Sequence, residues 1–361
     1  MKILDLVRRT VEMNASDLHL RFGQQPRLRV DGELYVIEEA PPTDEAMRDF
    51  LYSMLTKEQV ERFEQTHELD YSYAVPDLCR TRINLYVQRG QFCASLRVIP
   101  AHIPTMEEIY LPPPCYEFVK LNKGLVLVTG PTGCGKSTTL AAMIDYINST
   151  RRCHVLTIED PVEFVYEDKM ATVSQREITM DTGSFAAALR HSFRQDPDVV
   201  MIGEMRDLET MQAAITLAET GHLTFSTLHT GEASQTIHRI IDSFPPHQQS
   251  QVRMQLAMSL EGIISQSLLR LKGQKGRIAA REVLVCTRGV KNLIREGKIP
   301  QIATAMQTGT DEGMITMDSA LMDYFEKRLI SYETALAASF DKRAFAERTG
   351  RRSGASQAAG A

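Results

Sequence analysis

The first hundred residues consist of short stretches in which apolar and polar positions alternate, separated by turn signals. A helical pattern at 3–13 precedes the alternation SDLHL, and RLRV and ELYVI flank Asp31-Gly32, a dipeptide that favours a two-residue hairpin. Residues 43–66 have helical spacing, with Thr43 as the expected N-cap. Three strand-like runs follow: LDYSYAV, CRTRINLYVQ and QFCASLRVI. The pattern predicts a small domain of mixed helices and strands over residues 1–100.

A proline-rich stretch separates this domain from a second, larger one. It contains Pro100, Pro104 and Pro112–Pro114, which favour a stiff linker over 101–120 because proline fixes φ and removes a backbone donor. Four apolar strands then alternate with helical stretches: LVLVTG, HVLTIED, DVVMIGE and LTFSTLH. Such strands are typical of a parallel sheet covered on both faces, so residues 121–345 predict an α/β domain with a helical C-terminal part. The small, polar and basic stretch 346–361 predicts a disordered tail.

Composition and charge narrow the class of protein. The chain has 361 residues, 43% of them hydrophobic, and a formal charge of −5, which gives no overall attraction for nucleic acid or anionic lipid. It contains no run of 18 apolar residues and no apolar secretory segment at its start, so we expect a cytoplasmic protein without a transmembrane segment. The six cysteines include no CxxC pair, which argues against a structural zinc site.

A phosphate-binding loop is the most specific motif. Residues Gly130–Ser137 fit GxxxxGK[ST] and lie between the strand LVLVT and the helical run STTLAAMIDYI. Backbone N–H groups of such a loop cradle phosphates, Lys136 would reach the β- and γ-phosphates, and Ser137 would hold Mg²⁺. A chance glycine-rich turn would not lie between a strand and a helix in this way. We therefore predict binding of ATP and Mg²⁺ by Gly130, Pro131, Thr132, Gly133, Cys134, Gly135, Lys136, Ser137 and Thr138.

Acidic residues end two of the predicted strands, in the stretches 157–163 and 198–204. In an open parallel sheet the ligand lies beyond the carboxyl ends of the strands, where the phosphate loop also lies. We assign Glu204 as the residue that activates the attacking water and Glu163 as a Mg²⁺ contact, directly or through water. A solvated strand end is the alternative for any one acid, and the choice among Glu159, Asp160 and Glu163 stays open.

Two histidines bracket the strand LTFSTL, His222 before it and His229 at its end. Either histidine could sense the γ-phosphate through a hydrogen bond. A structural polar role is the alternative for each.

A pair of arginines in the first domain predicts an anion site. A two-residue hairpin at Arg89-Gly90 places Arg82 opposite Arg97 and aligns the apolar residues on the other face. Like charges directly opposite one another are destabilising unless an anion joins them. The arginines could act as fingers on a nucleotide held by a neighbouring subunit, and an exposed basic face is the alternative.

These motifs together resemble the PilT family of type IV pilus retraction motors, within the larger class of secretion and pilus ATPases. The matching segments include GPTGCGKSTTLAAMID, TIEDPVE and RQDPDVVMIGEMRDLETMQAAITLAETGHLTFSTLHT, and the resemblance extends from SDLHL to about residue 340. It implies a RecA-like P-loop ATPase domain with a smaller PAS-like N-terminal domain. It also implies roles in catalysis for Lys136, Glu163, Glu204, His222 and His229, and trans-acting roles for Arg82 and Arg97.

The resemblance further implies a homohexameric ring that hydrolyses ATP, retracts pili in twitching motility, and lies peripherally at the inner-membrane pilus base with a platform protein. Two departures from the family pattern, Arg270 and the stretch 289–292, lie in the region linked to retraction. An accessory retraction ATPase of the PilU type is therefore an alternative. A pilus-assembly or type II secretion motor is a less favoured alternative. Such motors usually carry an extra N-terminal domain and a four-cysteine zinc module, and this sequence has no CxxC pair. The intact set Lys136, Ser137, Glu163 and Glu204 disfavours a nucleotide-binding scaffold that does not hydrolyse ATP. The negative net charge disfavours a nucleic-acid translocase.

Overall fold

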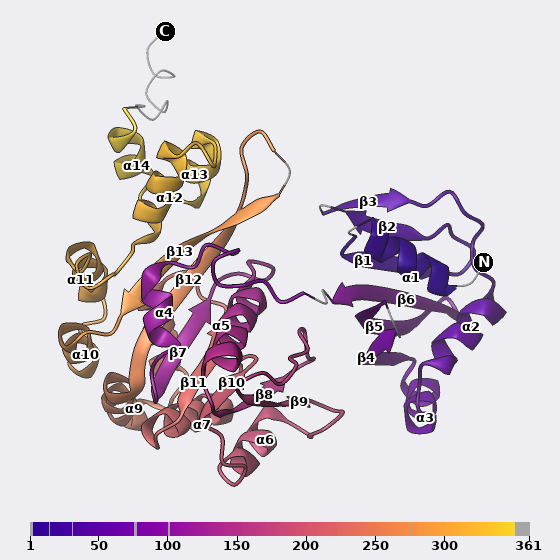
Figure 1. Cartoon of the computed structure of the whole chain (residues 1–361), viewed down its shortest axis with the longest axis horizontal. Coiled ribbons are helices and arrows are strands. Elements are labelled where there is room, and N and C mark those ends of the chain that lie inside the picture. The colour runs from indigo at the N-terminus through magenta and orange to yellow at the C-terminus, as the bar shows by residue number, and fades with distance from the viewer. Residues whose placement is uncertain are drawn as a thin grey trace. The chain divides into compact units, whose positions relative to one another are not determined.

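The computed structural model describes residues 3–13, 15–30, 32–75, 78–99, 102–274 and 276–350 (Figure 1). The chain divides into two compact units. The first comprises Met1–Ile103 and Pro161–Val165, and the second comprises Pro104–Asp160 and Tyr166–Ala361. Each unit is built around its own sheet.

The sheet of the first unit has six strands in the order β3-β2-β1-β6-β5-β4, and all neighbours are antiparallel. The strands are β1 (Asp17–Arg21), β2 (Arg27–Val30), β3 (Glu33–Val36), β4 (Glu68–Val75), β5 (Cys79–Gln88) and β6 (Gln91–Ile99). Helices α1 (Ile3–Glu12), α2 (Asp44–Ser53) and α3 (Lys57–Thr66) share one apolar core with alternate strand residues. The other set of alternate residues, which includes both paired arginines, therefore lies on the opposite face of the sheet.

The stretch 43–66 forms two helices because a second cap interrupts it. Thr43 accepts a hydrogen bond from the Ala46 amide and caps α2, as predicted. Thr56 and Gln59 form a capping box that starts α3 after a short break.

The second unit contains a seven-stranded sheet in the order β13-β12-β7-β11-β10-β8-β9, parallel except for the antiparallel pair β12 and β13. The strands are β7 (Gly124–Thr129), β8 (His154–Glu159), β9 (Thr172–Glu177), β10 (Val199–Ile202), β11 (Leu223–Leu228), β12 (Leu260–Arg270) and β13 (Arg277–Val285). The four predicted apolar strands are confirmed as β7, β8, β10 and β11. The sequence pattern did not indicate β9, because this edge strand, TVSQRE, is mostly polar.

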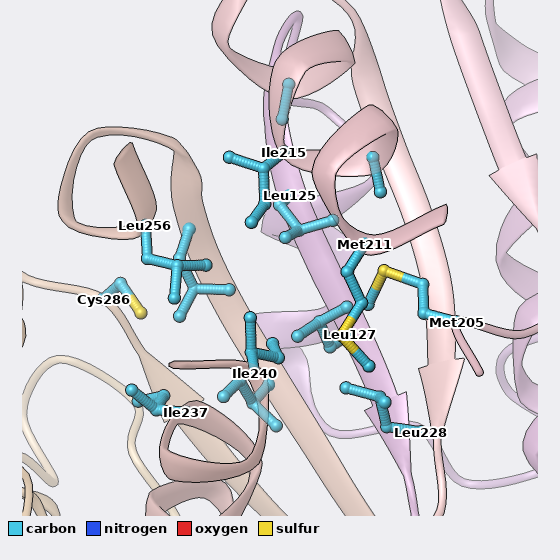
Figure 2. Close-up of a cluster of buried hydrophobic side chains, with 14 of the residues drawn as sticks. Leu125, Leu127, Met205, Met211, Ile215, Leu228, Ile237, Ile240, Leu256 and Cys286 are labelled. Carbon is cyan, nitrogen blue, oxygen red and sulfur yellow. The ribbon is translucent and has the colours of Figure 1, made fainter. Parts of the chain in front are cut away.

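The same unit contains the helices α5 (Lys136–Thr150), α6 (Phe185–Ser192), α7 (Leu208–Glu219), α8 (Ala233–Asp242) and α9 (Pro246–Ser259). Leu125 and Leu127 of β7 pack in one core with residues of α7, α8 and α9 (Figure 2). Val126 and Val128 are equally buried and, by strand alternation, face the other side of the sheet. The central strand is therefore covered on both faces, and the residue that follows it begins the phosphate loop.

The segments predicted as linker and tail are more structured than expected. Helix α4 (Pro113–Phe118) begins at the proline run, and its Phe118 ring lies where a Cβ on Gly262 of β12 would be. At the C-terminus, α10 (Arg288–Arg295), α11 (Gln301–Thr308), α12 (Met317–Glu326), α13 (Tyr332–Ala338) and α14 (Lys342–Arg348) follow β13. Helix α14 includes the first residues of the predicted tail, and residues 351–361 lie outside the described part. Within the described part, no helix combines the length and apolar character needed to cross a membrane.

Candidate functional site

The phosphate loop joins the end of β7 to the start of α5, with Gly135 as the helix N-cap. Gly130, Gly133 and Gly135 have φ values of 142°, 77° and 91°, which only glycine adopts without strain. A Cβ on Gly130 would lie 2.3 Å from the carbonyl oxygen of Gln266 in β12. The loop thus rests directly on a neighbouring strand, which explains the glycines of the motif.

Lys136 directs its ammonium group back onto this loop. Its Nζ donates to the carbonyl oxygens of Gly130 at 2.8 Å and Pro131 at 3.2 Å, and lies 3.3 Å from Nδ1 of His229. The residue is only 9% exposed, and no carboxylate pairs with it among the residues that the structure describes. A nearly buried cation held by neutral acceptors is well prepared to bind a phosphate.

His229 connects Lys136 to Glu204. Nε2 of His229 lies 3.0 Å from Oε1 of Glu204, and the second oxygen of Glu204 accepts from Nη2 of Arg206 at 2.9 Å. Because Nδ1 faces the ammonium donor, it serves as the acceptor, and the ring proton belongs on Nε2 and points to Glu204. The carboxylate in turn raises the pKa of Arg206. Glu204, His229 and Lys136 therefore converge at one edge of the sheet, as predicted, whereas Arg206 was not singled out from the sequence.

The acids that follow β8 differ in their surroundings. Glu159 is buried and accepts from the hydroxyl of Thr157 at 2.7 Å and from Nε2 of Gln175 at 3.2 Å. Asp160 and Glu163 are exposed, and Glu163 lies in the segment that groups with the first unit. The buried bonds of Glu159 support the end of the strand and leave the other two acids as the accessible carboxylates.

His222 lies at the opposite edge of the sheet from the phosphate loop. It precedes β11, and its carbonyl accepts from the amide of Gly124 at the start of the parallel strand β7. Six residues at roughly 3.3 Å each separate it from the far end of the strand. Its Nδ1 contacts the Thr220 hydroxyl at 3.2 Å and the Leu217 carbonyl at 3.1 Å. The structure therefore does not place His222 beside the phosphate loop of the same chain, and its contacts fit the structural alternative, in which it holds the turn between α7 and β11.

The arginine pair has the predicted register, with Arg82 opposite Arg97. The row continues across the sheet to Asp17 of β1, which lies opposite Arg97. Nε of Arg97 donates to Oδ1 of Asp17 at 2.9 Å, and Arg29 lies 4.0 Å from the other oxygen. Asp17 thus supplies an anion that the sequence reasoning missed, while Arg82 has no hydrogen-bond or ion-pair partner within the described residues.

Comparisons with known proteins agree with this geometry. The family model described as "Type II/IV secretion system protein" matches residues 113–322. The type IV pilus retraction ATPase PilT of Pseudomonas aeruginosa is 46% identical over 93% of this chain and 97% of its own length. A twitching motility protein of Neisseria gonorrhoeae is 42% identical over 92% of this chain and 89% of its own. This chain belongs to the PilT family of secretion and pilus ATPases.

Two solved structures of related ATPases have the same fold. The crystal structure of the pilus retraction motor PilT with bound ADP has a TM-score of 0.89 and 44% identity, covering 95% of this chain and 98% of that one. The Legionella pneumophila ATPase DotB has a TM-score of 0.79 and 29% identity, covering 92% and 94%. The predicted fold class is confirmed, and the chain is an ATP-hydrolysing, nucleotide-binding enzyme.

Proposed function

We propose that this chain powers the retraction of type IV pili by hydrolysing ATP, as a homohexameric ring at the inner-membrane pilus base. The observation that carries the proposal is the continuous contact from Lys136 through His229 to Glu204 beside the phosphate loop. It joins a phosphate-binding cation to a carboxylate that can orient water. Twitching motility and pilus retraction are named for the two relatives above, which this chain matches over most of its length.

The loop residues bind the nucleotide in this proposal. Its N–H groups and the N-terminus of α5 receive the phosphates, and Lys136 exchanges its carbonyl partners for phosphate oxygens. Ser137, half-buried in the first turn of α5, and the exposed Glu163 offer the oxygen ligands that Mg²⁺ prefers. When bound, Mg²⁺ neutralises charge on the phosphates. Thr138 follows in the same helical turn, and Cys134 packs beneath the loop as a small buried side chain.

Glu204 orients the attacking water in the hydrolysis step. His229 donates its Nε2 proton to one carboxylate oxygen and Arg206 binds the other, so both oxygens of Glu204 are held in place. A positioned carboxylate of this kind contributes about 10²–10⁴-fold to rate. His229 thereby links the group that binds phosphate to the group that acts on water.

Arg82 and Arg97 complete a nucleotide site on a neighbouring subunit. Their adjacent positions on one polar face present two guanidinium groups to an anion, and Asp17 holds Arg97 in place. A strictly monomeric preparation should then be nearly inactive. The pilus platform protein is the expected partner of the ring.

The first experiment measures ATP hydrolysis against oligomeric state by light scattering for wild type, Glu204→Gln and the control Glu209→Gln, which changes an exposed carboxylate on α7. Active wild-type and control hexamers with inactive Glu204→Gln hexamers support the motor. Active monomers contradict the shared site.

An accessory role of the PilU type is the second candidate. The PilU of Pseudomonas aeruginosa is 39% identical over 93% of this chain. Within the stretch that departs from the family pattern, Lys291 forms a 2.7 Å ion pair with Glu261 of β12. Wild-type hexamers without ATPase activity would favour this candidate over the motor.

A further inference from the structure

A nearly buried arginine lies behind the phosphate loop and has no acidic partner. Arg281 of β13 is 4% exposed, and no carboxylate pairs with it in the described part of the chain. Its Nη1 donates to the carbonyl oxygens of Ile109 at 2.8 Å and Tyr110 at 3.3 Å. Because arginine stays protonated even where burial lowers its pKa, the fold retains a charge that is costly to desolvate.

The other side of this guanidinium faces the nucleotide site. Nη2 of Arg281 lies 3.5 Å from the hydroxyl of Thr139 in α5. That hydroxyl donates to Oε1 of Gln266 at 2.9 Å, and Nε2 of Gln266 donates to the carbonyl of Cys134 in the phosphate loop at 2.8 Å. Thr139 and Gln266 are 1% and 2% exposed. An unbroken buried path of polar contacts therefore runs from the loop backbone to Arg281.

The far end of the path holds the segment 104–112, which we call the connector because it follows the first unit in the chain. Tyr110 has a φ of 53°, a left-handed conformation that is unfavourable for a bulky residue. Its amide donates to the carbonyl of Glu107, and the Leu111 amide donates to the carbonyl of Met106. Arg281 thus binds two carbonyls of a turn that needs outside support to persist.

The phosphate loop, at the other end of the path, should have different arrangements with and without a phosphate bound to Lys136. Nζ of Lys136 donates to the carbonyls of Gly130 and Pro131. Binding a phosphate to Lys136 requires those bonds to be given up, which changes the loop that also carries the Cys134 carbonyl. A buried hydrogen-bonded path transmits such a change because breaking any one of its bonds leaves an unsatisfied buried group.

We propose that Gln266, Thr139 and Arg281 are positioning residues that couple the phosphate loop to the connector, so that nucleotide binding changes the hydrogen bonding of the turn at Ile109 and Tyr110. This inference rests on the proposed function, in which the phosphate loop binds ATP and Lys136 exchanges its carbonyl partners for phosphate oxygens.

The test is hydrogen–deuterium exchange at the Tyr110 and Leu111 amides of the full-length chain, with and without saturating ADP. Thr139→Val removes the bridging hydroxyl and keeps the side-chain shape, and Thr139→Ser is the matched control that keeps the hydroxyl. We expect ADP to change exchange by about fivefold in wild type and Thr139→Ser, the size of effect one hydrogen bond gives. In Thr139→Val the response should disappear while the Kd for ADP changes less than about threefold.

A response that persists in Thr139→Val overturns the inference, as does wild-type protein that binds ADP without any change at these amides. If Thr139→Val does not fold, Gln266→Met breaks the same path one residue nearer the loop and is measured in the same way. Wild-type protein that binds ADP and shows the response but hydrolyses no ATP contradicts the proposed motor and leaves the coupling supported.

Discussion

Glu282 should make the second unit less stable as the pH rises toward neutrality. Its carboxylate is 6% exposed and accepts from the amides of Ala233 at 2.8 Å and Met317 at 3.4 Å, at the starts of α8 and α12. Burial raises its pKa from 4.5 to about 7, and the two amides only partly oppose this shift. Since the folded state binds the proton more tightly, the stabilisation is fully present below pH 4.5 and is lost as the pH rises through 7. The rise from 4.5 to about 7 corresponds to about 3 kcal/mol of unfolding free energy.

The assay is urea denaturation of wild type and Glu282→Gln between pH 4.5 and 8.5, followed by circular dichroism because the chain has no tryptophan. Glutamine cannot ionise, so the variant lacks this pH dependence and the other titrating groups cancel in the difference. The unfolding free energy of wild type minus that of the variant should fall by about 3 kcal/mol across the range. A difference that stays flat would show that the two amides cancel the effect of burial, and one that rises with pH would show that they outweigh it.

Two further changes test the nucleotide site. Arg82→Glu should lower ATP turnover by about 10³-fold or more, while the Kd for ADP at the phosphate loop stays within a few-fold of wild type. The control Arg89→Glu, at the exposed turn of the same hairpin, should leave turnover unchanged. Equal turnover in both variants would contradict the finger role of Arg82. Gly130→Ala places a Cβ 2.3 Å from the Gln266 carbonyl oxygen at a φ of 142°, so it should lower the Tm and abolish ADP binding. The control Gly183→Ala has open space around its Cβ and should do neither. Unimpaired ADP binding by Gly130→Ala would refute the close approach of the loop to β12.

The parts of the site that the sequence predicted depend on local rules. The hairpin register that pairs Arg82 with Arg97 follows from a two-residue turn, which leaves little freedom in the pairing. The meeting of Glu204 and His229 follows from the rule that parallel strands end at a common edge. The same rule places the start of a strand at the other edge, so His222 and His229 lie at opposite edges of the sheet although both flank one short strand.

The parts that the sequence did not predict depend on which strands become neighbours. Asp17 reaches Arg97 only because β1 pairs with β6, far along the chain. The sequence around RIAAREVLV indicates a strand pair, but it does not show that β12 pairs with β7 and so places Gln266 and Arg281 behind the phosphate loop. Long-range strand order is set by the packing of the whole core, and no motif of a few residues encodes it.

Three of the charged groups assigned to ATP hydrolysis have a substitute partner within the chain. Carbonyl oxygens hold Lys136, Asp17 holds Arg97, and His229 with Arg206 holds Glu204. These partners hold the three groups in position, and at the buried Lys136 and the half-buried Glu204 an unpaired charge would be costly. Phosphate binding must then replace these partners. This exchange of partners links nucleotide binding to a change in the protein more than the binding of an anion alone would. Release of phosphate returns each cation to its former partner, which makes the change reversible and allows it to be repeated with every ATP hydrolysed.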